Sequence, residues 1–174
     1  MKTITSERVV LRSISDIDLQ DIHKLHSLPQ VDRFNTLGIP ESLVETEETL
    51  AIWLKSNDLV FKIELKKDKS FVGLIALKPG NPKFKKAEVW YKLSPDFWNK
   101  GYGTEALEAI LNYGFKELGF HRIEAGCAVN NFGSIRVLEK AGMKREGRKR
   151  QILPLKDGWS DSFEYAILST DLNH

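Results

Sequence analysis

Two glycines in the stretch WNKGYGTEALEAI, residues 98–110, have the spacing of a phosphate-binding turn. Glycine carries no Cβ, so Gly101 and Gly103 would let the backbone approach phosphate oxygens closely. The helical pattern that follows at once would add free backbone N–H groups and the positive end of a helix dipole. Lys100 supplies a positive charge beside them. The stretch therefore favours a diphosphate site, with an ordinary glycine-rich start of a helix as the alternative.

Two better-known glycine motifs fit this turn poorly. Gly101, Gly103 and Ala106 satisfy the dinucleotide-binding pattern G-x-G-x-x-G/A, and Glu124 stands at about the distance of its ribose-binding carboxylate. That pattern requires a strand to run straight into the first glycine, whereas the segment 94–100 separates the preceding strand from Gly101. The nucleotide P-loop requires a Lys-Ser or Lys-Thr pair after its glycines, and none follows here.

A second motif lies in the stretch NNFGSIRVLEKAGMKREG, residues 130–147. Together with the glycine turn it resembles the GCN5-related N-acetyltransferases (GNAT), and within them the Rim-type ribosomal-protein-alanine N-acetyltransferases. The family's Q/R-x-x-G-x-G/A motif corresponds to residues 98–103, with Trp98 in the place of Gln or Arg. The segments 7–14 and 159–168 are similar to the family's first and last strands. The second motif corresponds to Asn131, Ser134, Leu138, Lys140 and Gly142.

The resemblance implies that the cosubstrate is acetyl-CoA, with its diphosphate on the glycine turn and its pantetheine arm beside the strand that precedes the turn. The amides of the arm would take backbone hydrogen bonds as an added strand does, so the neighbouring strand, 121–129, would have to splay away. The cofactor-binding residues expected on this basis are Tyr91, Lys92, Leu93, Asn99, Lys100, Gly101, Tyr102, Gly103, Thr104 and Asn131.

The resemblance also implies direct attack of an amine on the thioester. An ammonium is not nucleophilic, so a base must take its proton, directly or through water. Glu88 is the candidate base and shares a strand face with Trp90 and Lys92; an exposed glutamate paired with a lysine is the alternative. Ser134 would protonate the departing CoA thiolate, and a capping role at the start of its helix is compatible with this. A backbone N–H near Leu93 would stabilise the oxyanion.

The acceptor is expected between the first helical region and the final hairpin, where the resemblance points to Phe34, Asn35, Trp159 and Asp161. The preferred acceptor is the N-terminal α-amino group of a ribosomal protein, or of another protein or peptide. A polyamine, an amino acid or an aminoglycoside is the alternative with the same chemistry. A CoA-binding module without turnover is the alternative of another class. Relatives are often dimers, which leaves a homodimer open.

Hydrophobic periodicity supplies the elements that would hold these residues. Asp16 is expected to cap a first helix that places Ile17, Leu25 and Leu28 on its apolar side. The order of elements implies an α+β fold with helices packed on a mixed sheet, in a single domain spanning 1–174. The resemblance makes this the GNAT fold, whose mostly antiparallel sheet is strongly twisted and splayed. The expected helices are 16–28, 45–56, 104–117 and 130–142, and the expected strands are 7–14, 59–65, 71–78, 87–93, 121–129 and a hairpin around 156–158.

Composition argues against several classes of protein. The 174-residue chain has no run of 18 apolar residues and its N-terminus lacks the apolar block of a signal peptide, so no membrane partner and a cytoplasmic location are expected. Cys127 is the only cysteine and stands in an apolar, strand-like run, which favours a buried structural thiol. No metal site is expected, because metal-ligand spacing is absent from the four histidines, His23, His26, His121 and His174.

Charge is unevenly distributed along the chain, although the net charge is only +2. Residues 14–58 hold nine acidic and three basic side chains, which would favour a cationic substrate; two helices with solvated acidic faces are the alternative. The basic stretch 144–151 would meet RNA, a ribosomal surface or the 3′-phosphate of CoA. Because aromatic residues do not interrupt it, a solvated strand face is the preferred interpretation and nucleic acid is not expected as a partner.

Overall fold

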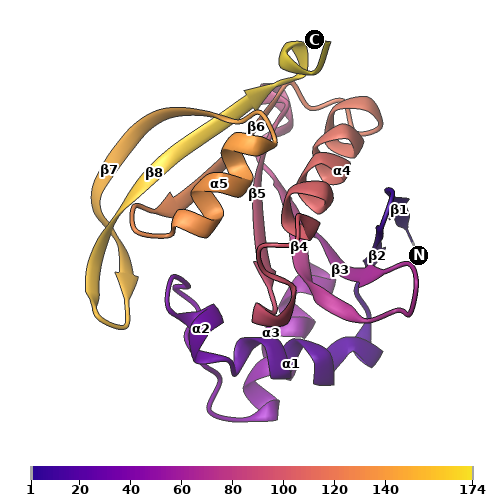
Figure 1. The fold of residues 1–174 in the computed structure, drawn as a ribbon, viewed down its shortest axis with the longest axis vertical. Helices are drawn as coiled ribbons and strands as arrows, with labels where there is room; N and C mark the ends of the chain where they lie inside the picture. The colour runs from indigo at the N-terminus through magenta and orange to yellow at the C-terminus, as the bar shows by residue number, and fades with distance from the viewer. Residues whose placement is uncertain (1, 174) are drawn as a thin grey trace.

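The structure is a computed structural model that describes residues 2–173. His174, one of the four histidines for which no metal site is expected, lies outside the described residues. Within these residues the strands form one 8-stranded sheet in the order β1-β2-β3-β4-β5-β6-β8-β7 (Figure 1). Neighbouring strands run antiparallel, except that β5 and β6 are parallel. The strands are β1 (Thr3–Thr5), β2 (Val9–Ser13), β3 (Leu59–Leu65), β4 (Phe71–Pro79), β5 (Lys86–Leu93), β6 (Arg122–Ala128), β7 (Lys144–Leu155) and β8 (Gly158–Leu168).

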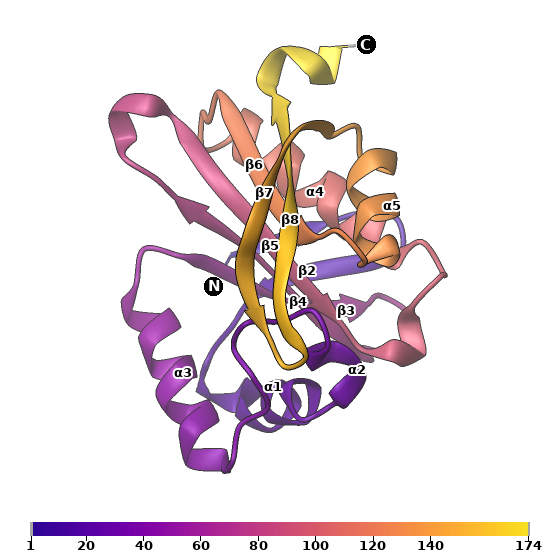
Figure 2. The same cartoon turned by 90° about the vertical axis from the view of Figure 1, so that its left-hand side faces the viewer.

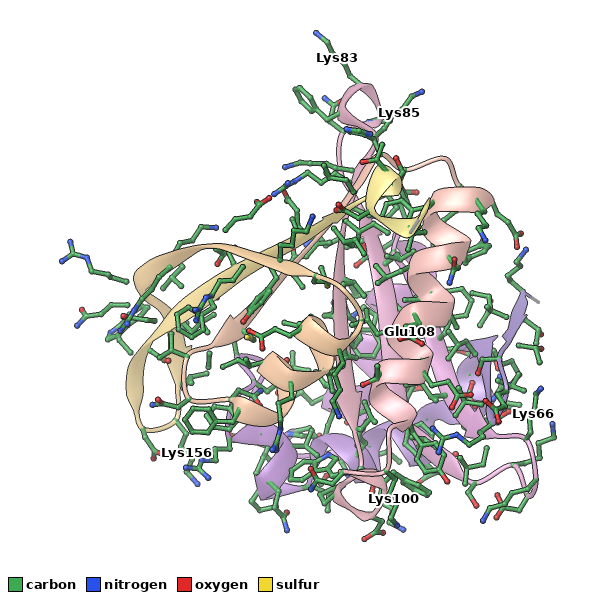
Figure 3. The ribbon with its side chains drawn as sticks, turned by 45° about the horizontal axis from the view of Figure 1, so that its top comes forward. Lys66, Lys83, Lys85, Lys100, Glu108 and Lys156 are labelled. Atoms are coloured by element: carbon green, nitrogen blue, oxygen red, sulfur yellow. The ribbon has the colours of Figure 1, made fainter. Side chains whose placement is uncertain are left out.

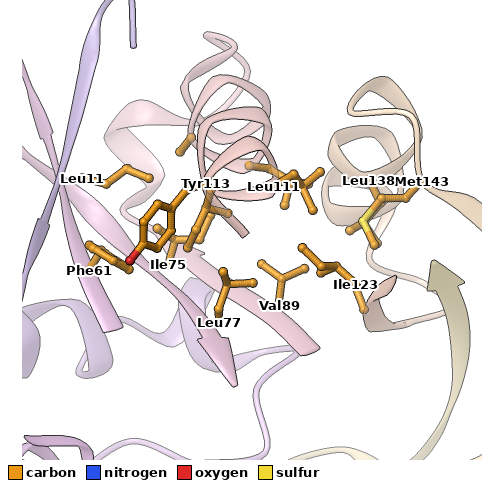
Figure 4. Close-up of a cluster of buried hydrophobic side chains, with 14 of the residues drawn as sticks. Leu11, Phe61, Ile75, Leu77, Val89, Leu111, Tyr113, Ile123, Leu138 and Met143 are labelled. Atoms are coloured by element: carbon orange, nitrogen blue, oxygen red, sulfur yellow. The ribbon is translucent and has the colours of Figure 1, made fainter. Parts of the chain in front are cut away.

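Helices cover both faces of the sheet, as Figures 1 and 2 show together. On one face α4 and α5 pack over the larger hydrophobic core (Figure 4), and on the other α1 and α3 pack over a smaller one. The α-helices are α1 (Leu19–His26), α2 (Pro29–Asp32), α3 (Leu43–Lys55), α4 (Tyr102–Lys116) and α5 (Phe132–Lys140). Single turns of 3₁₀ helix are η1 (Asp16–Asp18), η2 (Pro82–Phe84) and η3 (Pro95–Phe97), and η4 (Ser169–Asn173) ends the described chain.

The two cores explain the sequence patterns of the central strands. Both faces of β4 are covered, and its residues 72–77 are all buried, which requires a continuous apolar run. In β5 the alternation is clear: Ala87 and Val89 enter the larger core, whereas Trp90 packs against the smaller one. The two faces of β5 therefore meet different helices, which decides where each of its side chains can act.

The start of the first helical region differs from the prediction. Ser15 is the N-cap and Asp16 already belongs to η1. Ile17 is 83% exposed, so its expected place on the apolar side was wrong. A 3₁₀ turn has about three residues per turn, which rotates Ile17 away from the sheet. Ile22 and Leu25 carry the packing instead.

Two other elements were not predicted from hydrophobic periodicity, and one helix starts earlier than predicted. Pro29 opens α2, a short helix that was not predicted, because a proline suits the first helical position. The Ser42 hydroxyl accepts the N–H of Glu45 and starts α3 two residues before its expected position. The edge strand β1 was also missed. No helix in the described part of the chain is long and apolar enough to cross a membrane.

Candidate active site

The glycine turn forms the N-terminal end of α4. Gly101 caps the helix with φ of 83°, a left-handed conformation that glycine adopts without a Cβ penalty, and Asn99 has φ of 57°. Within residues 2–173 the backbone N–H groups of 99–104 donate to no protein acceptor. A Cβ on Gly103 would lie 3.3 Å from the Leu93 side chain, so this glycine lets α4 start close to β5. The turn thus presents free N–H groups at the positive end of a helix, as an anion site requires.

Side-chain contacts hold this turn in place. The indole Nε1 of Trp98 donates to the Leu93 carbonyl at 2.8 Å, which ties the turn to the end of β5. The Lys100 ammonium donates to the Asp96 carbonyl at 2.7 Å and lies at the end of the turn (Figure 3). The guanidinium of Arg8 donates to the Lys100 carbonyl at 3.1 Å. Trp98 therefore has a structural role of its own where the family has Gln or Arg.

Strands β5 and β6 separate along their length. Their Cα pairing is confined to Lys86–Arg122, Ala87–Ile123 and Glu88–Glu124. Beyond these pairs, residues 89–93 pair with β4 alone and residues 125–128 pair with β8 alone. The splay that the resemblance implied is therefore present. The facing edges of the two strands leave backbone groups without partners, as the binding of an added strand-like molecule requires.

Three neutral donors meet inside this splay, from three different elements. The Tyr91 hydroxyl of β5 lies 2.8 Å from the Ser134 hydroxyl of α5, and the buried Cys127 thiol of β6 lies near both. Burial raises the pKa of Tyr91 and raises that of Cys127 to about 11, so both stay protonated at neutral pH. The cap of α5 is Asn131, whose side chain accepts the Ser134 N–H at 3.2 Å. The Ser134 hydroxyl is therefore not used as the helix cap.

Glu88 stands at the closed end of the splay. It is exposed, and it is the last residue of β5 that pairs with β6. Its partner Glu124 is engaged by Arg122 at 2.7 Å and by Lys86 at 3.4 Å, whereas Glu88 forms no ion pair within the described residues. The carboxylate is accessible to water, and its role as the base remains a prediction.

The opposite face of β5 carries a cluster of aromatic and basic groups that sequence reasoning missed. The Lys92 ammonium lies 3.5 Å from Nε2 of His26 and 5.4 Å from the ring centroid of Trp90. The Trp53 ring packs on Trp90 at 5.4 Å and on His26 at 5.8 Å. Burial is the main cause that lowers the pKa of Lys92 to about 8 and that of His26 to about 3. The signal was the strand alternation, which sets Trp90 and Lys92 on one face.

Asp32, the last residue of α2, lies near this cluster, because the preceding residue, Val31, packs against the same smaller core as Trp53 and Trp90. Its exposure is 7%, and its Oδ1 has no hydrogen-bond partner among the described residues. It is the carboxylate whose charge acts on Lys92. The sequence offered no motif for this residue, because α2 itself was not predicted.

On the N-terminal side, the predicted acceptor residues follow α2. Phe34 lies under the guanidinium of Arg33, 5.1 Å from the ring centroid. The Asn35 side chain accepts the N–H of Leu37 at 3.3 Å and so shapes the following turn. These contacts leave the predicted acceptor role of Phe34 and Asn35 untested.

On the other side, Trp159 and Asp161 belong to the β7–β8 hairpin, whose tip lies beside α2 (Figure 2). Trp159 is 66% exposed. Asp161 accepts from the guanidinium of Arg148 at 2.6 Å and from the N–H of Gln151 at 2.8 Å, in a part of the hairpin where the register shifts. Its contacts shape the hairpin, and its predicted contact with an acceptor is not tested.

Charges in the basic stretch 144–151 are largely paired with their neighbours. Lys144 pairs with Asp171 at 2.8 Å and Lys149 with Glu164 at 3.2 Å. The guanidinium of Arg145 lies over Phe163 of β8. These contacts favour the interpretation of an exposed strand face. Within residues 2–173 no group of three metal-ligating side chains is present.

Comparison with known proteins agrees with this geometry. Residues 8–144 match the family model described as acetyltransferase (GNAT) domain. The chain belongs to this family. Several relatives are named N-acetyltransferases, and the chain is an enzyme of the acyltransferase class with the GNAT fold.

Three similar proteins carry more specific names. An uncharacterized N-acetyltransferase, YnaD, of Bacillus subtilis is 34% identical over 98% of this chain and 99% of its own. The putative ribosomal N-acetyltransferase YdaF of Bacillus subtilis is 32% identical over 60% of this chain and 57% of its own. The crystal structure of spermidine N-acetyltransferase from Vibrio cholerae, in complex with CoA and spermine, superposes with a TM-score of 0.86 at 26% identity, covering 95% of this chain and 98% of that one.

Proposed function

We propose that this enzyme transfers the acetyl group of acetyl-CoA to a primary amine by direct attack on the thioester. The observation that carries the proposal is the splay of β5 from β6, which opens toward the free N–H groups of the turn at Gly101. Acetyl-CoA fits both features, since its diphosphate suits the turn and its arm suits the unpaired edge of residues 91–93. Similarity to a spermidine N-acetyltransferase solved with CoA supports this choice.

The residues inside the splay have roles in this scheme. The reaction leaves a thiolate, and Ser134 is the proposed donor of its proton, with the Tyr91 hydroxyl 2.8 Å away as a second donor. Glu88 is the proposed base that accepts a proton from the amine through water, because its carboxylate is exposed beside the closed end of the splay. Backbone N–H groups near Leu93 would stabilise the oxyanion.

For the acceptor, we propose the α-amino group of a protein or peptide N-terminus, as in the Rim-type enzymes. Similarity to a putative ribosomal N-acetyltransferase supports it, together with the serine in the N-x-x-S motif at Asn131. A small polyamine is the second candidate. The cluster of Trp53, Trp90 and Asp32 favours it, because indole rings and a carboxylate suit a cation.

The test is a transfer assay that follows release of the CoA thiol. The panel contains peptides that begin with alanine, their N-acetylated forms, spermidine, free amino acids and an aminoglycoside, and mass spectrometry locates the acetyl group. Transfer to the free α-amine alone supports the first acceptor, and transfer to spermidine alone supports the second. Tight binding of CoA without transfer to any amine would contradict the proposal and identify a CoA-binding module.

A further inference from the structure

Asp32 has a buried carboxylate oxygen that accepts no hydrogen bond within the described residues. The residue is 93% buried, and its carboxylate oxygen Oδ1 has no donor within the described part of the chain. Burial of a carboxylate without donors is unfavourable by several kcal/mol in general, so such atoms are rare in folded proteins. A donor that comes from outside the chain would satisfy it.

Lys92, a cation close to Asp32, leaves this oxygen free. Lys92 is close enough for the charge of Asp32 to raise its pKa, against the larger lowering by burial. Yet the two side chains form no ion pair within the residues described, since the Lys92 ammonium contacts His26 at 3.5 Å. The carboxylate and the ammonium thus lie close enough for their charges to interact without forming an ion pair.

The walls of this region suit a cation. The ring centroids of Trp53 and Trp90 lie 5.4 Å apart with the ring planes tilted by 37°. Indole faces attract ammonium groups, and the Lys92 ammonium lies 5.4 Å from the Trp90 centroid. Lys92 belongs to residues 89–93, the part of β5 that has no partner on its β6 side. Figure 2 shows α2 next to the tip of the β7–β8 hairpin, where the acceptor was expected to enter.

We propose that Asp32 determines acceptor specificity by binding an ammonium group of the acceptor through its carboxylate. This inference rests on the proposed transfer to an amine and assigns the acceptor class: amines and peptides whose neighbouring groups are neutral or cationic. Asp32 repels an acceptor carboxylate whereas the nearby Lys92 ammonium attracts it, so the preference is read from the loss of ammonium binding when the Asp32 charge is removed.

The kinetic test uses Asp32→Asn, which keeps the side-chain shape and removes the charge. The variant is expected to raise KM for the best amine of the panel about 10- to 100-fold, because a hydrogen bond between charged groups is lost. KM for acetyl-CoA stays near that of the wild type, and the thermal midpoint rises, because the variant no longer buries a carboxylate without a donor. Asp16→Asn, at an exposed aspartate of η1, is the matched control and changes neither. An unchanged amine KM in Asp32→Asn overturns the inference.

A binding test does not depend on turnover. Butylamine, charged at pH 7, is titrated against the fluorescence of the tryptophans, with butan-1-ol as its neutral counterpart. The inference requires that butylamine perturbs the wild type and that Asp32→Asn weakens its binding at least tenfold, whereas butan-1-ol has little effect. Binding without any acetyl transfer would refute the proposed function and leave the Asp32 site standing. Acetyl transfer that does not depend on Asp32 would support the proposed function and refute the Asp32 site.

Discussion

Replacing Gly73 by alanine should move the part of β5 that faces the splay. Gly73 of β4 pairs with Leu93, and a Cβ added to it would lie 2.1 Å from the Lys92 carbonyl oxygen and 2.8 Å from the Leu93 Cα. Both neighbours are backbone atoms, so no flexible side chain can give way. Carbon atoms of this kind do not approach closer than 3.0 Å, so the strand must shift by about 0.9 Å.

The size of the effect follows from this shift. Overpacking of a core generally costs about 1–3 kcal/mol, which lowers the thermal midpoint of a chain this long by about 2–12 °C. A displacement of about 1 Å in a group that positions a substrate lowers activity by about 100-fold. The displaced backbone carries the proposed edge for the pantetheine arm, so KM for acetyl-CoA should rise as well.

Urea unfolding and the transfer assay together check this prediction. Gly80→Ala is the matched control, because its nearest neighbour would lie at 3.4 Å, an ordinary contact distance. That variant should stay within about 0.5 kcal/mol of the wild type. Equal stability and equal activity of Gly73→Ala and the wild type would show that β5 does not depend on this close approach, and the account of the site would be wrong.

Three further predictions concern the same site. If Ser134 protonates the thiolate, Ser134→Ala should lower kcat about 100-fold with little change in KM for acetyl-CoA. The role would be excluded if the variant and the wild type had the same rate with a thioester whose thiol is a poor leaving group. Trp98→Phe removes the 2.8 Å hydrogen bond to Leu93 and should weaken CoA binding several-fold in calorimetry, with unfolding stability reduced by about 1 kcal/mol. For Lys92, burial lowers the pKa from 10.5 to about 8, so the folded protein loses this proton at a lower pH than the unfolded chain. The free energy of unfolding should therefore rise between pH 8 and 10.5, by about 3 kcal/mol at most, and Lys92→Met should flatten that rise in urea titrations at several pH values.

Sequence patterns were sufficient where a local signal and the final environment agree. The glycine turn was visible because Gly101 and Gly103 are required by backbone geometry alone, and the strand alternation around Trp90 follows from a sheet with two packed faces. The same reasoning misplaced Ile17, because one turn of 3₁₀ helix changes the direction of a side chain without changing the hydrophobic pattern.

The role of Ser134 shows what sequence spacing leaves open and the tertiary structure decides. Its position in the second motif marked it as both a possible cap and a proton donor, and sequence spacing alone left these alternatives open. The structure assigns the cap to Asn131 and places the Ser134 hydroxyl 2.8 Å from that of Tyr91, a residue distant in the chain. Such a contact depends on how α5 packs across the splay, which no local pattern encodes.

The amino-acid sequence by itself therefore determined the family, the order of most elements and the turn that suits a diphosphate, since each of these rests on residue types at short spacing. Only the tertiary structure decided which side chains meet on the acceptor side. Asp32, His26, Trp53 and Lys92 come from three helices and a strand, and their charges and burial act on one another only once α1, α2 and α3 pack against β5. Long-range packing is a property of the whole chain, so this cluster, where we propose that the acceptor binds, depends on the fold rather than on any motif.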